Sequence, residues 1–200
     1  MQHRRPYTKR RRAESEAETR DRIVAATVAL HEEVGPARTT VAAIAERAGV
    51  HRPTVYRHFP ETSDLLAACS GLWERMHPPP DPGSWIAVRS PEARLRVALD
   101  ELYAYYEETG TMIRNVLADG AVVPEVAVYA AQFEEYFSMI GDVLMADRRD
   151  VGRLTHAAVA VAVAFETWAT ATRRAELTRA EAVDLAVGLV AATAPPRRHA

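Results

Sequence analysis

The segment TTVAAIAERAGVHRPTVYRHF, residues 39–59, constrains the fold of this chain most strongly, because it holds two short helical patterns separated by one glycine. Val41, Ile44 and Ala48 recur at helical spacing before Gly49. Glycine readily adopts the left-handed conformation that ends many helices, so a sharp turn is expected there. The helix after the turn is too short to hold a core by itself, and we expect it to be presented to a partner.

Neighbouring residues predict where these helices begin. Thr40 is a favourable N-cap for the helix over residues 41–48. Pro53 falls in the first turn of the next helix, where its missing N–H has no cost, and Val55 and Phe59 are expected to point inward. An earlier helical pattern stops at Gly35 and consists of Ile23, Ala26, Thr27, Leu30 and Val34. Three helices around one small core are therefore predicted.

The chain after residue 60 shows further helical patterns and no convincing strand alternation. Thr62 is expected to cap a fourth helix that runs as far as Met76, and the segment HPPPDPGS, residues 77–84, cannot continue it. A further helix is expected from Pro91. The predicted fold class is all-α, with an N-terminal three-helix helix-turn-helix domain followed by a larger helical domain.

The C-terminal part of the sequence predicts two more helices. Residues 154–171 are apolar nearly all round, so one helix covered on several sides is expected there. Thr178 and Glu181 have the spacing of a capping box, which predicts a last helix that ends before Pro195.

Charge is distributed unevenly along the 200 residues, although the net charge is only −2. Residues 1–60 contain 12 Lys/Arg and 7 Asp/Glu, whereas residues 61–200 contain 13 and 20. A basic run near the N-terminus would repel itself in a packed element, so residues 1–18 are expected to form a flexible arm suited to phosphate; a solvated tail is the alternative. The run consists of Arg4, Arg5, Lys9, Arg10, Arg11 and Arg12.

The composition favours a cytoplasmic protein. Cys69 is the single cysteine, which rules out an intramolecular disulfide and fits a reducing compartment. Apolar runs of about 18 residues, as a membrane span needs, are absent from the sequence, and the charged start MQHRRPYTKRRR does not lead into a secretory signal. We therefore expect no membrane partner.

The residue types of the short helix suit the reading of duplex DNA. The N-terminal residues of the second helix of a helix-turn-helix enter the major groove. Arg52 has the donors for guanine O6 and N7, Thr54 can hydrogen-bond a base or phosphate, and Pro53 can touch a thymine methyl. Backbone N–H groups at the start of the preceding helix can receive a phosphate. The predicted DNA-binding residues are Thr39, Thr40, Arg52, Pro53, Thr54, Tyr56, Arg57 and His58, the last three as phosphate contacts.

Residues 39–66, TTVAAIAERAGVHRPTVYRHFPETSDLL, resemble the TetR family of bacterial transcriptional regulators. The resemblance covers about 45 residues from Arg20 and depends on Thr40, Ala48-Gly49-Val50, Pro53-Thr54-Val55-Tyr56, His58-Phe59 and Leu65-Leu66. Two residues depart from the family pattern. His51 replaces the usual Ser or Thr cap of the recognition helix, and Thr62 stands where the family usually has a phosphate-contacting lysine.

The resemblance implies a ligand pocket in the middle helices and a dimer interface built by the last two. Large apolar side chains and one amide are the candidate ligand-binding residues, although for each one taken singly a core role is favoured. They are Trp85, Tyr103, Tyr106, Met112, Asn115, Phe133, Phe137, Phe165 and Trp168. Glu166 and Thr170 are further polar candidates; Glu166 could instead lie on an exposed strip or at the dimer seam.

Other interpretations remain open at this point. The segment 39–59 could be an ordinary helical hairpin, with Tyr56 and Phe59 as packing residues. An enzyme is disfavoured, because the seven histidines show no metal-ligand spacing and no phosphate loop occurs. Cys69 could sense oxidants, but an isolated apolar cysteine is usually inert core. A ligand-independent architectural DNA-binding protein is the other alternative.

We therefore expect a homodimeric transcriptional regulator, a repressor released from a palindromic operator by an apolar or amphipathic small molecule. No metal or cofactor is expected. The predicted organisation is a basic arm over residues 1–18, a helix-turn-helix domain over 19–61, a ligand-binding and dimerisation domain over 62–194, and a tail over 195–200.

Overall fold

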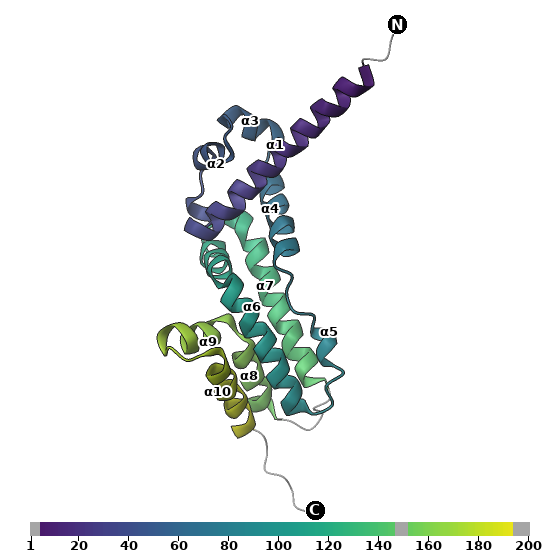
Figure 1. The fold of residues 1–200 in the computed structure, drawn as a ribbon. Helices are drawn as coiled ribbons and strands as arrows, with labels where there is room; N and C mark the ends of the chain where they lie inside the picture. The colour runs from purple at the N-terminus through teal and green to yellow at the C-terminus, as the bar shows by residue number, and fades with distance from the viewer. Residues whose placement is uncertain (1–4, 147–151, 194–200) are drawn as a thin grey trace, which may run out of the picture. The chain divides into compact units, whose positions relative to one another are not determined.

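A computed structural model describes residues 5–146 and 152–193, and every regular element within these ranges is a helix (Figure 1). The predicted all-α class is confirmed. The N-terminal elements are α1 (Arg5–Val34), the 3-10 turn η1 (Pro36–Arg38), α2 (Val41–Ala48), α3 (Arg52–His58) and α4 (Thr62–Met76). They are followed by α5 (Pro82–Trp85), α6 (Pro91–Gly120), α7 (Pro124–Met145), α8 (Arg153–Val163), α9 (Phe165–Ala169), the π-helical turn η2 (Thr170–Arg174) and α10 (Arg179–Ala192).

The chain divides into two compact units. One unit comprises Met1–Pro78 with Thr111–Ala130, and the other comprises Pro79–Gly110 with Ala131–Ala200. The long helices α6 and α7 each contribute to both units. The helix-turn-helix segment therefore shares its unit with α4, with the C-terminal part of α6 and with the start of α7. The tail predicted over residues 195–200 lies outside the described residues.

The core of the first unit is small and apolar. α2 packs against α1 and α3, and α4 packs against α1. The buried apolar side chains of these elements include Ile23, Ile44, Val55, Phe59 and Leu65. Residues 5–18, which the charge pattern assigns to an arm, form the start of α1, and this part of α1 extends past the other helices of the unit (Figure 1). The stretch AESEAETR, residues 13–20, is rich in strong helix formers, which accounts for the early start.

The turn between α2 and α3 has the predicted geometry. The Thr40 side chain accepts a hydrogen bond from the Ala43 N–H at 3.2 Å and caps α2. Gly49 ends the helix in the left-handed conformation, with φ 65° and ψ 40°. His51 precedes α3 without making a side-chain cap, and Pro53 lies in the first turn. The local signals in the sequence thus place both short helices correctly.

The start of α4 differs from the prediction. Glu61 is the N-cap, with an extended backbone at φ −107° and ψ 138°, and Thr62 is already the first helical residue. The prediction that Thr62 caps this helix is therefore wrong, because an N-cap residue must have the extended backbone that Glu61 has.

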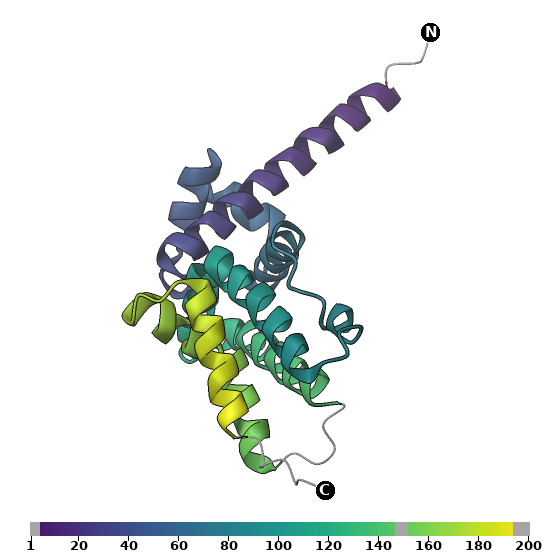
Figure 2. The ribbon, with the colours of Figure 1, turned by 60° about the horizontal axis from the view of Figure 1, so that its bottom comes forward.

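The second unit contains α5, α8, α9, η2 and α10 together with parts of α6 and α7. Leu95, Leu99 and Leu102 of α6 are buried in its core. α8 and α10 lie side by side (Figure 2), and the Thr155 hydroxyl donates to the Thr193 carbonyl oxygen at 3.0 Å. The predicted capping box is present, because Thr178 and Glu181 each hydrogen-bond the backbone of the other.

The single helix expected over residues 154–171 is interrupted. α8 ends at Val163, Ala164 is extended with φ −66° and ψ 137°, and α9 begins at Phe165. The carbonyl oxygens exposed by the break accept hydrogen bonds from the buried hydroxyls of Tyr103 (to Ala162, 2.8 Å) and Tyr106 (to Val163, 2.7 Å). These tertiary partners satisfy the backbone groups that a continuous helix would have paired internally.

Within residues 5–146 and 152–193, no single helix combines the length and apolar composition needed to cross a membrane. The segments Arg153–Val163 and Phe165–Arg174, bent by 62°, together pass that test by length and composition only.

Candidate nucleic-acid interface

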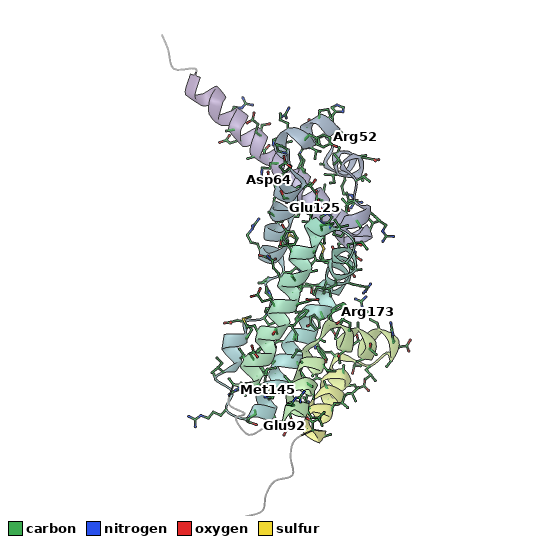
Figure 3. The ribbon with its side chains drawn as sticks, turned by 180° about the vertical axis from the view of Figure 1, so that it is seen from behind. Arg52, Asp64, Glu92, Glu125, Met145 and Arg173 are labelled. Carbon is green, nitrogen blue, oxygen red and sulfur yellow. The ribbon has the colours of Figure 1, made fainter. Side chains whose placement is uncertain are left out.

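The helix α3 has one buried face and one exposed face. Val55 is 1% exposed and packs into the core, whereas Tyr56 is 56% exposed. Arg52, Pro53 and Arg57 are also exposed, and Arg52 lies at the start of the helix (Figure 3). Two arginines, one tyrosine and one proline are thus exposed on a helix of 7 residues.

Two predicted contacts of α3 are less accessible. Thr54 and His58 are half-buried, and the Nε2 atom of His58 is covered and has no hydrogen-bond partner among the described residues. His58 lies in the last turn, next to the buried Phe59. In the described conformation its covered Nε2 does not reach a phosphate, and the predicted contact needs a side-chain rotation.

The threonines before α2 already take part in local bonds. The Thr39 hydroxyl donates to the Gly35 carbonyl oxygen at 2.8 Å, and the Thr40 oxygen accepts from Ala43. The Thr40 hydroxyl proton is not used in that cap. The first N–H groups of a helix have no intrahelical partners, so those of Val41 and Ala42 form, with Thr40, a group of donors suited to a phosphate.

Three arginines that the sequence analysis missed support the helix-turn-helix. Arg22 donates to the Ala48 carbonyl oxygen at 3.2 Å, at the C-terminal end of α2. Arg47 pairs with Glu33 through both carboxylate oxygens, and its hydrogen bond holds the pKa of Glu33 below the usual value. The Arg20 guanidinium lies 4.5 Å from the centre of the Phe59 ring. Which α1 side chains reach α2 depends on the packing of α1, which no local pattern reveals.

Cys69 is buried behind this interface. Its sulfur lies 3.9 Å from the Val24 carbonyl oxygen, and burial raises the pKa of the thiol to about 12. The reactive thiolate is therefore scarce at neutral pH, which disfavours oxidant sensing.

Six of the candidate ligand-binding residues come together in the second unit around Tyr106, and we call them the aromatic cluster. The Tyr106 ring lies 5.7 Å from Phe137, 5.4 Å from Phe165 and 5.6 Å from Trp168, centre to centre. Tyr103 stacks on Tyr106 at 6.2 Å, and Phe133 stacks on Phe137 at 6.4 Å. The cluster consists of Tyr103, Tyr106, Phe133, Phe137, Phe165 and Trp168.

Polar atoms within the aromatic cluster are few. The hydroxyls of Tyr103 and Tyr106 are bonded to α8, and burial raises the pKa of Tyr103 to about 12, so this hydroxyl stays a donor. Trp168 is 2% exposed, and its indole N–H has no hydrogen-bond partner among the described residues. The Arg173 guanidinium lies 5.0 Å from the centre of the Trp168 ring. The unpaired donor gives the cluster one site for a hydrogen-bond acceptor.

The other three candidates lie elsewhere. The Trp85 indole donates to Glu101 at 2.7 Å. Met112 and Asn115 belong to the first unit, and the Asn115 amide bonds the end of α1. Groups of three or more His, Cys, Asp or Glu side chains arranged to hold a metal ion are not found in the described part of the chain.

Comparisons with known proteins agree with this arrangement. Residues 23–69 match the family model described as bacterial regulatory proteins, tetR family. A stretch of 52 residues is 46% identical to uncharacterized HTH-type transcriptional regulators of Mycobacterium tuberculosis and Mycobacterium bovis. The match covers 26% of this chain and 28% of each relative.

Solved structures resemble most of the described fold. A TetR-like transcriptional regulator from Rhodococcus sp. RHA1 has a TM-score of 0.60 and 18% identity, over 86% of this chain and 93% of that chain. A TetR transcription regulator from Haloarcula marismortui has a TM-score of 0.59 and 22% identity, over 90% of this chain and 100% of that chain. The family model matches across the second half of α1, α2, α3 and the start of α4, so this part of the chain is similar to the tetR family of bacterial regulatory proteins, and the solved structures show that the fold is similar as well.

Proposed function

We propose that this protein is a DNA-binding transcriptional regulator that reads duplex DNA with α3. The observation that carries the proposal is the division of α3 into a face that buries Val55 and a face that exposes Arg52, Pro53 and Arg57. A helical hairpin built only for packing has no need of exposed arginines on such a short second helix. Arginine at the start of this helix suits guanine, and the later residues suit phosphates.

The regulator is proposed to act as a homodimer. Exposed apolar side chains lie at helical spacing on two adjacent helices: Leu154 (67% exposed) and Val161 on α8, and Leu185 and Leu189 on α10. A second copy of the same surface would cover them, as expected of an isologous interface. Two recognition helices would then read half-sites about 34 to 36 Å apart.

The proposed effector is an apolar or amphipathic small molecule that releases the protein from a palindromic operator. Its proposed site is the aromatic cluster, where the unpaired indole N–H of Trp168 offers a hydrogen bond among apolar rings. Such a molecule acts as an inducer only if it binds the DNA-free conformation more tightly than the DNA-bound one.

The DNA-reading proposal is tested by selecting duplexes from random-sequence DNA with the full-length protein. The expected product is a two-fold symmetric consensus, bound by a dimer. Failure to enrich any sequence would contradict DNA reading. Titration of a library of apolar and amphipathic compounds against the selected duplex tests the effector; an affinity that no compound changes would favour the ligand-independent architectural protein instead.

A further inference from the structure

The chain between α1 and α2 makes a tight turn that leads into the helix-turn-helix. Gly35 has φ 87° and ψ 155°, a backbone conformation that favours glycine, and Pro36 begins η1 directly after it. Glycine has no side chain, so η1 has no side-chain cap from its own N-cap residue. The Ala37 N–H, the first one in η1 because proline has none, is exposed and has no partner within η1, so either water or a side chain from elsewhere can accept its hydrogen bond.

Asp119, in the last turn of α6, supplies that acceptor. Its Oδ2 accepts a hydrogen bond from the Ala37 N–H at 2.8 Å, across 82 residues of sequence. A carboxylate is unfavourable at the C-terminal end of its own helix, where the macrodipole prefers cations. The carboxylate of Asp119 therefore does not stabilise α6, and its hydrogen bond to Ala37 is what explains a carboxylate at this position.

Asn115, one helical turn earlier on the same face of α6, holds the other side of the turn. Its Nδ2 donates to the carbonyl oxygens of His31 and Glu32, each at 2.9 Å. The His31 carbonyl oxygen also accepts the Gly35 N–H at 3.0 Å, whereas the residue four positions after Glu32 is Pro36, which has no N–H to donate. The two side chains thus cap the end of α1 and the start of η1 together.

The fit between this face of α6 and the turn is close. A Cβ atom added to Gly35 would lie 2.6 Å from Asp119 Oδ2 and 3.7 Å from Asn115 Cβ. The atom at 2.6 Å is the end of the flexible Asp119 side chain, which a Cβ would displace, whereas the backbone conformation with φ 87° is what favours glycine at residue 35. All these groups belong to the same compact unit.

Separate contacts hold the other end of α2. Arg22 bonds the Ala48 carbonyl oxygen, and Arg47 pairs with Glu33. The apolar core around Ile44 and Val55 holds the body of α2 and α3. Loss of the Asp119 contact should therefore loosen the N-terminal end of α2, where Thr40 and the free N–H groups lie, without unfolding the helix-turn-helix.

We propose that Asn115 and Asp119 are positioning residues for DNA binding, which hold the turn over residues 35–39 and so fix the N-terminal end of α2 against the DNA backbone. The proposal rests on the DNA-binding function proposed above. Neither side chain contacts DNA itself. Their effect passes through Ala37 and the last turn of α1 to the phosphate-facing donors at the start of α2.

The test compares Asp119→Ala, Asp119→Asn and Asn115→Ala with the unchanged protein on the duplex selected from random DNA. For Asp119→Ala, a positioning role predicts weaker DNA binding, whereas electrostatics alone predicts tighter binding, because a negative charge is removed. We expect Asp119→Ala to bind about tenfold more weakly, as loss of a bond to a charged group implies. Asp119→Asn keeps an acceptor and should retain most of the affinity.

Two further measurements distinguish a positioning role from a loss of folded protein in the variant. Stoichiometric titration should show a full active fraction for Asp119→Ala, and the slope of log affinity against log salt should not change, because no phosphate-neutralising cation is removed. Amide hydrogen exchange at Ala37 should become faster in Asp119→Ala only. Glu125→Gln, an exposed carboxylate of the same unit, is the charge-matched control and should bind as well as the unchanged protein or better (Figure 3).

Asp119→Ala with unchanged or tighter binding would overturn the proposal, as would a weakening that Glu125→Gln reproduces. If Asp119→Ala does not fold, Asn115→Ala decides: weaker binding with a full active fraction supports positioning, and unchanged affinity overturns it. Failure of the unchanged protein to select any DNA sequence would instead contradict the proposed function.

Discussion

The hydroxyl of Tyr106 donates a hydrogen bond of 2.7 Å to the carbonyl oxygen of Val163, the last residue of α8. The two residues are 57 positions apart in sequence. Burial raises the pKa of Tyr106 well above its usual value, so the hydroxyl remains protonated and can only serve as a donor or neutral acceptor. The break between α8 and α9 is therefore held by a side chain of α6.

Removing this hydroxyl should destabilise the fold. Tyr106→Phe would leave the Val163 carbonyl without its partner, at a cost of about 1 to 3 kcal/mol in the free energy of unfolding. Chemical denaturation followed by circular dichroism measures the difference. Tyr56→Phe, which removes the same atom from an exposed ring, is the control and should change stability by less than about 0.5 kcal/mol. Equal stabilities for Tyr106→Phe and the unchanged protein would contradict this account of the break.

Acidification should weaken the first unit through His31. Burial lowers the pKa of His31 from 6.5 to about 4, with the nearby Asp119 charge opposing the shift. Because the pKa is lower in the folded state, the unfolded chain takes up the proton first as the pH falls. The free energy of unfolding is therefore unaffected by the titration of His31 above pH 6.5 and decreases as the pH falls from 6.5 to about 4. The total decrease is roughly 3 kcal/mol.

The His31 contribution is isolated by comparing the unchanged protein with His31→Gln, which cannot take up a proton in this range. Urea unfolding at a series of pH values from 7.5 to about 4 should show a steeper loss of stability in the unchanged protein. Parallel curves for the two proteins would mean that His31 is not kept neutral by burial.

Association through α8 and α10 should depend on their exposed apolar side chains. Leu189→Glu would place a charge in the centre of the proposed interface, where an unpaired buried charge is strongly unfavourable. Sedimentation velocity at micromolar concentration should then show monomers. Val122→Glu changes a more exposed side chain outside these helices and should leave the dimer intact. If the Leu189→Glu protein still sediments as a dimer, the proposal that α8 and α10 form the interface is wrong.

Thr62 permits a test in which DNA affinity and stability change in opposite directions. Thr62→Lys should add one phosphate contact in each subunit, so the slope of log affinity against log salt should steepen by about 1.8, at roughly 0.9 per contact. Since Glu61 is the N-cap, no cap is lost. The new cation lies at the positive end of α4 and should cost about 0.3 to 1 kcal/mol.

Fluorescence anisotropy at several salt concentrations and a thermal melt measure both effects of Thr62→Lys. Thr62→Gln, which lengthens the side chain without a charge, is the matched control. An unchanged salt slope for the lysine variant would show that residue 62 does not face the DNA backbone.

Local signals predicted the helix-turn-helix well. The Thr40 cap, the left-handed Gly49 and the early Pro53 each act within a few residues of their own helix, so the pattern alone was sufficient. The cap of α4 was misplaced by one residue, because both Glu61 and Thr62 precede the same apolar pattern and only the backbone distinguishes them.

Long-range partners account for what the sequence did not predict. The break at Ala164 occurs in a run without glycine or proline, and it depends on hydroxyls of Tyr103 and Tyr106 more than 50 residues away. The contact of Asp119 with Ala37 spans 82 residues. The aromatic cluster was predicted as a set of residue types, but its centre on Tyr106 depends on how α6, α7 and α9 pack.

We propose that α3 reads base edges, and the substitution of Arg52 tests this proposal most directly. Arg52→Ala should remove discrimination at one base pair in each half-site, at a cost of about 1 to 3 kcal/mol against the preferred base, and leave the other positions as selective as before. Arg57→Ala, an exposed arginine of the same helix, should weaken all sequences similarly.

The decisive measurement is therefore the affinity of the Arg52→Ala protein for a complete set of single-base variants of the selected duplex. We expect a loss of preference confined to one symmetric pair of positions. A uniform loss across every variant would make Arg52 a phosphate contact, and an unchanged specificity profile would contradict the assignment of α3 as the DNA-reading helix.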